Sequence, residues 1–311
     1  MAYTNEQLIK AAELYYYEDY THMEIAKETH LSRSAITRMM QVAKKRNIVK
    51  IIIDKSPINI KELENKLATE KRLDKAIIVN KNYSSPYDNI KSICNEASKY
   101  LMEIIKDKDI VGLGWGNSVY EMINTLAYTS NKNATIVPII GGIDENDEIY
   151  NLNSIVQQAG EKLGCNHYKL YAPAIVDSKS VCEAIKSDSK ISNICDVWDK
   201  MDIAVIGIGA LKTKMAGKIK EFLSQHTVNF SELGIVADVC CNYMDINGNT
   251  VTTILNDSLI AANINQLKKT PKTIAIACGQ DKKNAILSCL NNGFINVLVT
   301  DTQTALDLLE E

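Results

Sequence analysis

Seven short runs of apolar, often β-branched residues recur along this 311-residue chain, starting at residue 76. They occupy residues 76–80, 109–116, 134–142, 168–176, 202–210, 273–280 and 296–301. Runs that are apolar almost throughout are typical of strands buried on both faces, as in a parallel sheet covered by helices. Amphipathic stretches lie between them, for example at residues 117–127 and 282–291. The pattern therefore predicts one doubly wound, mainly parallel α/β domain.

A change of sequence character near Lys55-Ser56-Pro57 marks the expected start of this domain. Pro57 disfavours helix at the residue before it and interrupts the apolar stretch upstream. We therefore predict two domains, residues 1–54 and residues 55–311. A short helix over residues 60–71 leads into the larger domain and is a candidate for subunit association.

Residues 21–49 have the pattern of a helix-turn-helix. Ser32 is a good N-cap for the second helix, because its hydroxyl can accept a hydrogen bond from the first-turn amides. One apolar stripe then recurs at helical spacing, formed by Ile36, Met39, Met40 and Ala43. A helix over residues 8–15 can cover the back of the pair, and residues 49–53 have the composition of a strand. The segment therefore predicts a winged helix-turn-helix.

The polar face of the second helix carries the candidates for DNA contact. Short hydroxyls suit base edges, and long cationic side chains suit phosphates and guanine. The candidates are Ser32, Arg33, Ser34, Thr37, Arg38, Gln41, Lys44 and Lys45. Residues 31–50 contain no carboxylate, although the chain as a whole has a net charge of -3, and a phosphate backbone would explain this basic segment. The alternative is an ordinary two-helix corner with a solvated charged face.

The composition, 46% hydrophobic and 23% charged, is typical of globular domains. No stretch approaches the roughly 18 uninterrupted apolar residues of a transmembrane helix, and the first residues, MAYTNEQLIK, lack the apolar part of a signal peptide. We therefore expect a cytoplasmic protein. The eight cysteines fit reduced, buried thiols, because the chain has no C-x-x-C pair and no Cys/His ligand spacing. We expect neither a metal nor a cofactor.

A glycine-rich segment, residues 112–118, passes directly from an apolar run into a helical pattern. Its glycines let the backbone approach an anion, and the amides of Asn117, Ser118 and Val119 would point at it. The spacing is neither that of a dinucleotide-binding loop nor that of a P-loop, so neither NAD nor ATP is favoured. A tight strand-to-helix turn is the alternative. The glycines at 141–142 and 207–209 are weaker signals, since close strand–helix packing also requires glycine.

Two further segments point to a ligand. Asp238 places a carboxylate inside an apolar run, which is unfavourable unless hydroxyls or amides satisfy it, as sugar hydroxyls would. Gln280 and Lys282 follow another apolar run at the start of a helix, where Lys282 adds a cation to the helix-start amides. The alternatives are a helix cap or turn residue for Asp238 and a solvated surface lysine for Lys282.

Several motifs then stand in a fixed order along nearly the whole chain: LYYYEDYTHMEIAKETHLSRSAITRMM, VGLGWGNSVYEMI, VPIIGGI, YAPAIVDS, AVIGIGAL, GIVADVCCNYMDINGN, IAIACGQDKKNAIL and INVLVTDTQTALDLL. The set resembles the SorC family of sugar-responsive transcriptional regulators, close to its deoxyribonucleoside and central glycolytic members. The resemblance implies a winged helix-turn-helix and an effector domain similar in fold to sugar-phosphate isomerases and glucosamine-6-phosphate deaminases. It also implies a phosphorylated sugar as effector and a homodimer or homotetramer.

Carried over by motif, the resemblance implies a set of effector-binding residues. They are Gly114, Trp115, Gly116, Asn117, Ser118, Gly141, Gly142, Asp238, Gln280 and Lys282. Three positions depart from the family. Ile140 stands where members responding to deoxyribose phosphate carry a Schiff-base lysine, which excludes covalent capture by that route. Asn117 stands where relatives often have arginine or threonine, and Asn242 stands where arginine is frequent, so an unphosphorylated sugar or polyol remains possible as the effector.

The function expected from these features is a DNA-binding transcriptional regulator, whose operator affinity or oligomeric state changes when a sugar or sugar phosphate binds. Its expected partners are double-stranded operator DNA, the small-molecule effector and further copies of the chain, with no membrane. No catalytic residue is assigned, because no histidine lies beside a carboxylate in a proton-transfer motif. The alternatives are a sugar-phosphate isomerase or deaminase with an accessory domain, and a DNA binder without a ligand.

Overall fold

The computed structural model describes residues 3–18, 20–46, 48–49, 59–80, 86–129, 133–143, 151–210 and 232–310. The chain forms two compact units, Met1–Pro57 and Ile58–Glu311. The predicted boundary between residues 54 and 55 lies outside the described residues, and so does the predicted wing strand except for Val49.

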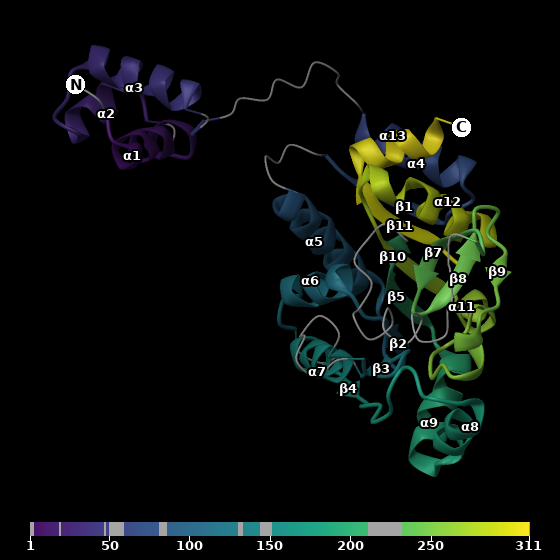
Figure 1. The fold of residues 1–311 in the computed structure, drawn as a ribbon. Coiled ribbons are helices and arrows are strands. Elements are labelled where there is room, and N and C mark those ends of the chain that lie inside the picture. Colours follow the sequence, from purple (N-terminus) through teal and green to yellow (C-terminus); the bar gives the residue numbers. More distant parts are fainter. Residues whose placement is uncertain are drawn as a thin grey trace. The chain divides into compact units, whose positions relative to one another are not determined.

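The described part of the first unit contains the helices α1 (Asn5–Tyr16), α2 (His22–Glu28) and α3 (Arg33–Lys45) (Figure 1). Capping boxes begin the first two helices, and the hydroxyl of Ser32 accepts from the Ala35 amide at the start of α3, which confirms the predicted N-cap. One face of each helix is buried in a shared core, to which α3 contributes the predicted stripe of Ile36, Met39, Met40 and Ala43. The helix-turn-helix pattern is therefore confirmed.

Within the described part of the second unit, a seven-stranded parallel sheet has the order β1-β11-β10-β5-β2-β3-β4. Its strands are β1 (Lys75–Val79), β2 (Ile110–Leu113), β3 (Thr135–Pro138), β4 (Asn166–His167), β5 (Ile203–Gly207), β10 (Lys272–Ile276) and β11 (Val297–Asp301). The strands β10 and β11 are buried almost completely, as the continuous apolar runs predicted. The predicted parallel α/β domain is thus confirmed.

Helices cover both faces of this sheet (Figure 1). On one side pack α5 (Pro86–Ile104), α6 (Asn117–Thr125) and α7 (Leu152–Leu163), and on the other lie α4 (Ile60–Glu70), α12 (Lys283–Asn292) and α13 (Thr302–Leu309). The helix α12 ends at Gly293, which has the left-handed φ of 84° predicted by the Asn-Gly pair. No helix among the described residues is long and apolar enough to span a bilayer.

One predicted strand is wrong. Residues 168–176 do not form a strand; the edge strand is the preceding β4, and the segment makes only single bridges, between Pro173 and Gly142 and between Ile175 and Leu259. Pro173 has no amide hydrogen, so it cannot continue a ladder of hydrogen bonds. The segment instead continues to α8 (Lys179–Ser187) and α9 (Ser189–Val197).

A second, antiparallel sheet was not predicted. It consists of β6 (Gly209–Ala210), β7 (Ile235–Val239), β8 (Asn242–Asp245) and β9 (Thr250–Val251), in that order. Figure 1 shows it beside the parallel sheet, on the side of α12. Its first strand, β6, is separated from β5 by Ile208 alone. The backbone therefore passes from one sheet into the other within a single residue.

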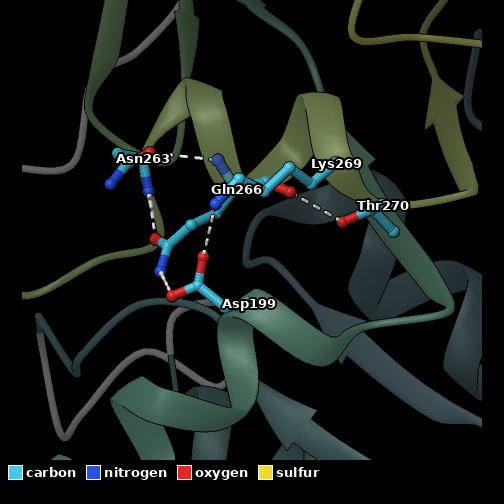
Figure 2. A network of polar contacts seen from close by, with 5 residues as sticks. All are labelled: Asp199, Asn263, Gln266, Lys269 and Thr270. Atoms are coloured by element: carbon cyan, nitrogen blue, oxygen red, sulfur yellow. Dashed lines mark hydrogen bonds and ion pairs between the residues drawn. The ribbon is translucent and has the colours of Figure 1, made fainter.

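A surface network of polar side chains joins the short helix α11 (Ile264–Lys269) to the 3₁₀ turn η1 (Trp198–Lys200) (Figure 2). Asp199 accepts from Gln266 at 3.0 Å and from Lys269 at 3.2 Å, and these donors hold the pKa of its carboxyl below the usual range. The indole of Trp198 donates to the carbonyl of Pro138 at the end of β3. This network anchors segments that precede β5 and β10.

The strand order reverses between β2 and β5. From β2 the chain builds outward through β3 and β4, whereas from β5 it builds in the opposite direction through β10 and β11. In open α/β sheets, ligands bind at the carboxyl ends of the strands at such a switch point. The segments after β2, β5 and β10 are therefore where an effector site is expected.

Candidate DNA-contact face and effector site

The structure places every predicted DNA-contact residue on the exposed surface of α3 or at its N-cap. These residues are Ser32, Arg33, Ser34, Thr37, Arg38, Gln41, Lys44 and Lys45. Three of them, Arg38, Gln41 and Lys45, line a hollow of about 400 Å³ together with Tyr3 and Val42. The face is continuous and basic, with the apolar stripe on the opposite side of the helix.

Two residues beside this face were missed. His22, the first residue of α2, places Nδ1 at 3.2 Å from Oγ1 of Thr37. Arg46, which follows α3, donates to the carbonyl of Tyr3 at 3.1 Å and to Oδ1 of Asn5 at 3.0 Å, and so ties α3 to the start of α1. Contacts between helices leave no periodic signal in a sequence, so these roles were not predicted.

In the effector domain, the segment after β2 packs against the tip of the β7–β8 hairpin. The Gly114 amide donates to the Val205 carbonyl at 2.9 Å, and a Cβ at Gly114 would lie only 2.9 Å from Sγ of Cys240. Trp115 is buried, with 9% of its surface exposed. Gly114 and Trp115 therefore fix the position of the loop.

The next residues form the start of α6. Gly116 is the N-cap, with a φ of 105° that disfavours side chains, and no side chain caps the first-turn amides. Nothing lies within 4 Å of the place a Cβ of Gly116 would occupy. Ser118 is buried and Asn117 exposed. The helix start is thus open and its amides are available to an anion.

Lys282 approaches this helix start from the far side of β5. Its ammonium donates to the Ile208 carbonyl at 2.8 Å, and burial lowers its pKa, against the influence of nearby Cys278, Asp281 and Cys94. Cys94 in turn donates its thiol hydrogen to the Ser118 carbonyl at 3.3 Å. Lys282 is therefore a partly buried cation beside the α6 start. The alternative of a solvated surface lysine does not fit this placement.

Asp238 lies on β7 directly opposite Gly209 of β6. Its Oδ1 accepts from the Cys241 amide at 2.9 Å, and burial raises the pKa of its carboxyl from 3.8 to about 6. The turn it stabilises has φ of 49° at Cys240 and 61° at Cys241, the positive values of a two-residue hairpin turn that glycine and asparagine usually occupy. Asp238 thus stabilises the turn through Oδ1, while its Oδ2 lies 3.6 Å from the place that a Cβ of Gly209 would occupy.

Asn242 holds the same turn from the other side. Its Nδ2 lies 3.1 Å from the Val239 carbonyl, 3.2 Å from that of Cys240 and 3.0 Å from that of Ala262. Asn242 is buried and its amide is engaged in this way, so in this chain its side chain stabilises the backbone of the turn.

These contacts bring most of the predicted effector residues together. The loop at 114–118 lies against Cys240, and the place that a Cβ of Gly207 would occupy is 3.9 Å from Ser118. Lys282 donates to the carbonyl of Ile208. Asp238 pairs with Gly209, the next residue along the chain. These residues therefore lie together at the switch point between β2 and β5.

Gly141 and Gly142 lie one strand away, after β3. Their amides donate to the carbonyls of Ile260 at 2.9 Å and Ala172 at 3.0 Å, and a Cβ at Gly141 would lie 2.5 Å from the backbone of Pro173. Gly141 is therefore required for close packing, whereas the space at Gly142 is open. Ile140, where a Schiff-base lysine would stand, is an apolar side chain with 1% of its surface exposed.

Gln280 is exposed on the 3₁₀ turn η3 (Gln280–Lys282), which precedes α12. The helix α12 thus begins at Lys283, one residue later than predicted. Gly279, the N-cap of η3, has a φ of 110°, close to that of Gly116. The cysteines of the chain are free, most of them buried. In the described ranges, no group of three or more His, Cys, Asp and Glu side chains is arranged to hold a metal.

Comparison with known proteins places the chain in a family. Residues 55–310 match the family model described as "Putative sugar-binding domain". The sorbitol operon regulator of Klebsiella pneumoniae is 27% identical over 306 residues, and the deoxyribonucleoside regulator of Bacillus subtilis is 25% identical over 307 residues, each match covering 97% of both chains.

The crystal structure of the full-length sorbitol operon regulator SorC from Klebsiella pneumoniae has a TM-score of 0.76 and 26% sequence identity to this chain. It covers 99% of this chain and 100% of that one, so the likeness includes both units. These relatives are named as regulators and not as enzymes, and a further relative, LsrR of Escherichia coli, is named as a transcriptional regulator. The chain therefore belongs to the sugar-binding domain family and is a DNA-binding transcriptional regulator of the SorC type.

Proposed function

We propose that the effector is a small sugar or polyol carrying one anionic group, bound noncovalently at the switch point of the parallel sheet. The proposal is carried by one observation: Lys282 contacts Ile208, Asp238 lies opposite the next residue, Gly209, and the uncapped start of α6 lies close to the same segment. Each of these groups offers a different interaction, so together they indicate which chemical groups the ligand carries.

The anionic group of the effector belongs at the start of α6. The unpaired amides and the positive end of the helix dipole favour a phosphate there, and Lys282 adds a cation. Asp238 accepts hydrogen bonds from sugar hydroxyls, which satisfy a carboxylate oxygen that would otherwise be buried at a cost. Because Ile140 replaces the amine that would attack an aldehyde, binding is noncovalent. Gln280, Asn117 and Gly142 form the exposed rim.

We further propose that residues 1–54 bind operator DNA and residues 55–311 bind the effector, in a homodimer or homotetramer. Two helix-turn-helix units read half-sites about one helical turn, or a multiple of it, apart. The effector changes operator affinity only if it binds two arrangements of the subunits with different affinities. The names of the two curated relatives make polyol phosphates and pentose phosphates the first candidates to test.

Thermal unfolding of the full chain with a panel of hexose, pentose and polyol phosphates tests the proposal. A ligand that binds only the folded protein raises its melting temperature, by an amount that grows with ligand concentration. We expect one sugar or polyol phosphate to do so, while inorganic phosphate and the unphosphorylated parent compound act weakly or not at all. Stabilisation by none of the panel, or equally by all, would contradict the proposal.

A Lys282→Ala variant connects the ligand to this site. We expect it to weaken binding of the phosphorylated ligand, whereas Lys269→Ala, which removes an exposed lysine from α11, leaves binding unchanged. Equal affinities of Lys282→Ala and the unchanged protein would place the site elsewhere.

A further inference from the structure

A contact between α2 and α3 fixes the hydroxyl of Thr37 in the middle of the DNA-contact face. The hydroxyl donates to the Arg33 carbonyl at 3.1 Å and lies 3.2 Å from Nδ1 of His22. The imidazole of His22 is itself held against the ring of Tyr15, with the ring centroids 4.9 Å apart. Thr37 is exposed, so its remaining side faces solvent.

The hydroxyl of Thr37 has one hydrogen and two lone pairs. Its hydrogen can be directed to the Arg33 carbonyl or to Nδ1 of His22, and in both arrangements it is held within the protein. What Thr37 presents outward is a lone pair and a methyl group.

We propose that Thr37 determines base specificity as a hydrogen-bond acceptor, with His22 as the positioning residue. In the major groove, only the exocyclic amines of adenine and cytosine donate hydrogen bonds. Guanine and the O4 of thymine offer acceptors, which a hydroxyl without a free hydrogen cannot satisfy. Every base pair contains one such amine, so Thr37 selects the strand that presents it: adenine or cytosine on the strand that Thr37 faces, over thymine or guanine. This inference rests on the proposed DNA-contact face of α3.

Selection of binding sites from a random DNA duplex pool tests the inference, using the full-length protein without effector. The variants are Thr37→Val, which keeps the shape but removes the acceptor, and His22→Phe, which keeps the ring against Tyr15 but removes the nitrogen. Thr37→Ser retains the hydroxyl. His30→Asn is the matched control, because it removes the imidazole of an exposed histidine from the same unit and asparagine tolerates the φ of 54° there.

We expect Thr37→Val to erase the preference at one base pair of each half-site, where the unchanged protein selects adenine or cytosine on one strand roughly threefold to tenfold over thymine or guanine on that strand. His22→Phe should weaken the preference at the same base pair, because the hydroxyl hydrogen then has only the Arg33 carbonyl as a partner and is freer to rotate toward a base. Thr37→Ser should retain the amine preference, and His30→Asn should leave the whole consensus unchanged.

Three results overturn the inference. The first is an unchanged consensus with Thr37→Val, and the second is equal selection of adenine and guanine on the same strand at that base pair, because the amines of these two pairs lie on opposite strands. The third is a His22→Phe consensus identical to that of the unchanged protein, which removes the positioning role. Failure of the proposed DNA-contact face gives a different result from failure of this inference. If α3 does not contact DNA, the Arg38→Ala variant selects the same site as the unchanged protein and binds it equally well. Circular dichroism and melting curves establish that each variant is folded.

Discussion

The Cys241 amide donates a hydrogen bond of 2.9 Å to Oδ1 of Asp238, across the turn that joins β7 to β8. This bond ties the conformation of a buried turn to the ionisation of one carboxylate. Burial opposes the charge and raises the pKa of Asp238 to about 6, although the amide favours the charged form. This side chain in the folded protein thus ionises around pH 6.

The pH dependence of stability should reflect this raised pKa. The folded state binds more protons than the unfolded state between the ordinary pKa of 3.8 and about 6, so the contribution of Asp238 to stability falls as the pH rises through this window. The loss by pH 7 is at most about 3 kcal/mol. Asp238→Asn keeps an acceptor for the Cys241 amide and should not show this loss.

Urea unfolding of both proteins at pH 4 and pH 7 checks this prediction. Other carboxylates titrate in the same range, so the relevant quantity is the difference between the two proteins. We expect Asp238→Asn to gain stability relative to the unchanged chain on going from pH 4 to pH 7. A constant difference would show that Asp238 ionises at its ordinary pKa.

Replacing Gly116 should separate effector binding from DNA binding. Gly116→Val places a branched side chain in the open space before α6, where the proposed anion binds, and forces it to a φ of 105°. We expect the ligand to lose its effect on operator affinity while binding of the operator itself persists. Calorimetry with the ligand and gel-shift titration with the operator measure the two properties.

Gly293→Val is the matched control for Gly116→Val. Gly293 also has a positive φ, 84°, with nothing within 4 Å of the place of its Cβ, but it lies at the end of α12. The control shares the backbone strain and should still respond to the effector. Loss of the response in both variants would assign the effect to strain.

Arg38→Ala should weaken operator binding by on the order of 1–3 kcal/mol, which corresponds to the loss of one good base or phosphate contact. Arg38 is exposed on the contact face, and its Nε donates only weakly to the Ser34 carbonyl at 3.4 Å, so the fold should be unaffected. Gel-shift titration at fixed salt, beside Lys10→Ala on the exposed side of α1, tests the placement. Equal affinities of both variants and the unchanged protein would refute it.

Lys282→Ala should weaken a phosphorylated ligand more than its unphosphorylated analogue. A hydrogen bond to a charged group contributes about 1.5–3 kcal/mol, so we expect roughly a tenfold or greater loss for the phosphate. The unphosphorylated analogue should lose much less. Calorimetric titrations of both ligands against both proteins give the comparison, and an equal loss for the two ligands would mean that Lys282 does not meet the phosphate.

The sequence predicted the parts of the fold that depend on periodicity. The apolar stripe of α3, the strands β5, β10 and β11 and the helix α12 lie where apolar spacing placed them. The antiparallel sheet was missed because β6 and β9 have only two residues each, too few for a pattern. Residues 168–176 misled because they are apolar and β-prone, although Pro173 prevents a continuous ladder.

The site was predictable where a residue type was unusual for its surroundings. Glycines before a helix, Asp238 in an apolar run and Lys282 at a helix start all carry such a signal. The contacts of Ile208 and Cys240 could not be predicted in this way. They involve a backbone carbonyl and a thiol that only the folded chain brings close to Lys282 and Gly114. Gly141 shows the converse: its glycine signal came from packing against Pro173.

Ile208 occupies an unusual place in the chain, since it is the single residue between the parallel strand β5 and the antiparallel strand β6. Its carbonyl holds the ammonium of Lys282, a group that a bound anion would attract. An anion bound at the start of α6, as we propose, would compete with this carbonyl for the ammonium. Binding would then change a contact made by the one residue that joins the two sheets, and we expect β5 and β6, on either side of Ile208, to be where the change is first detected.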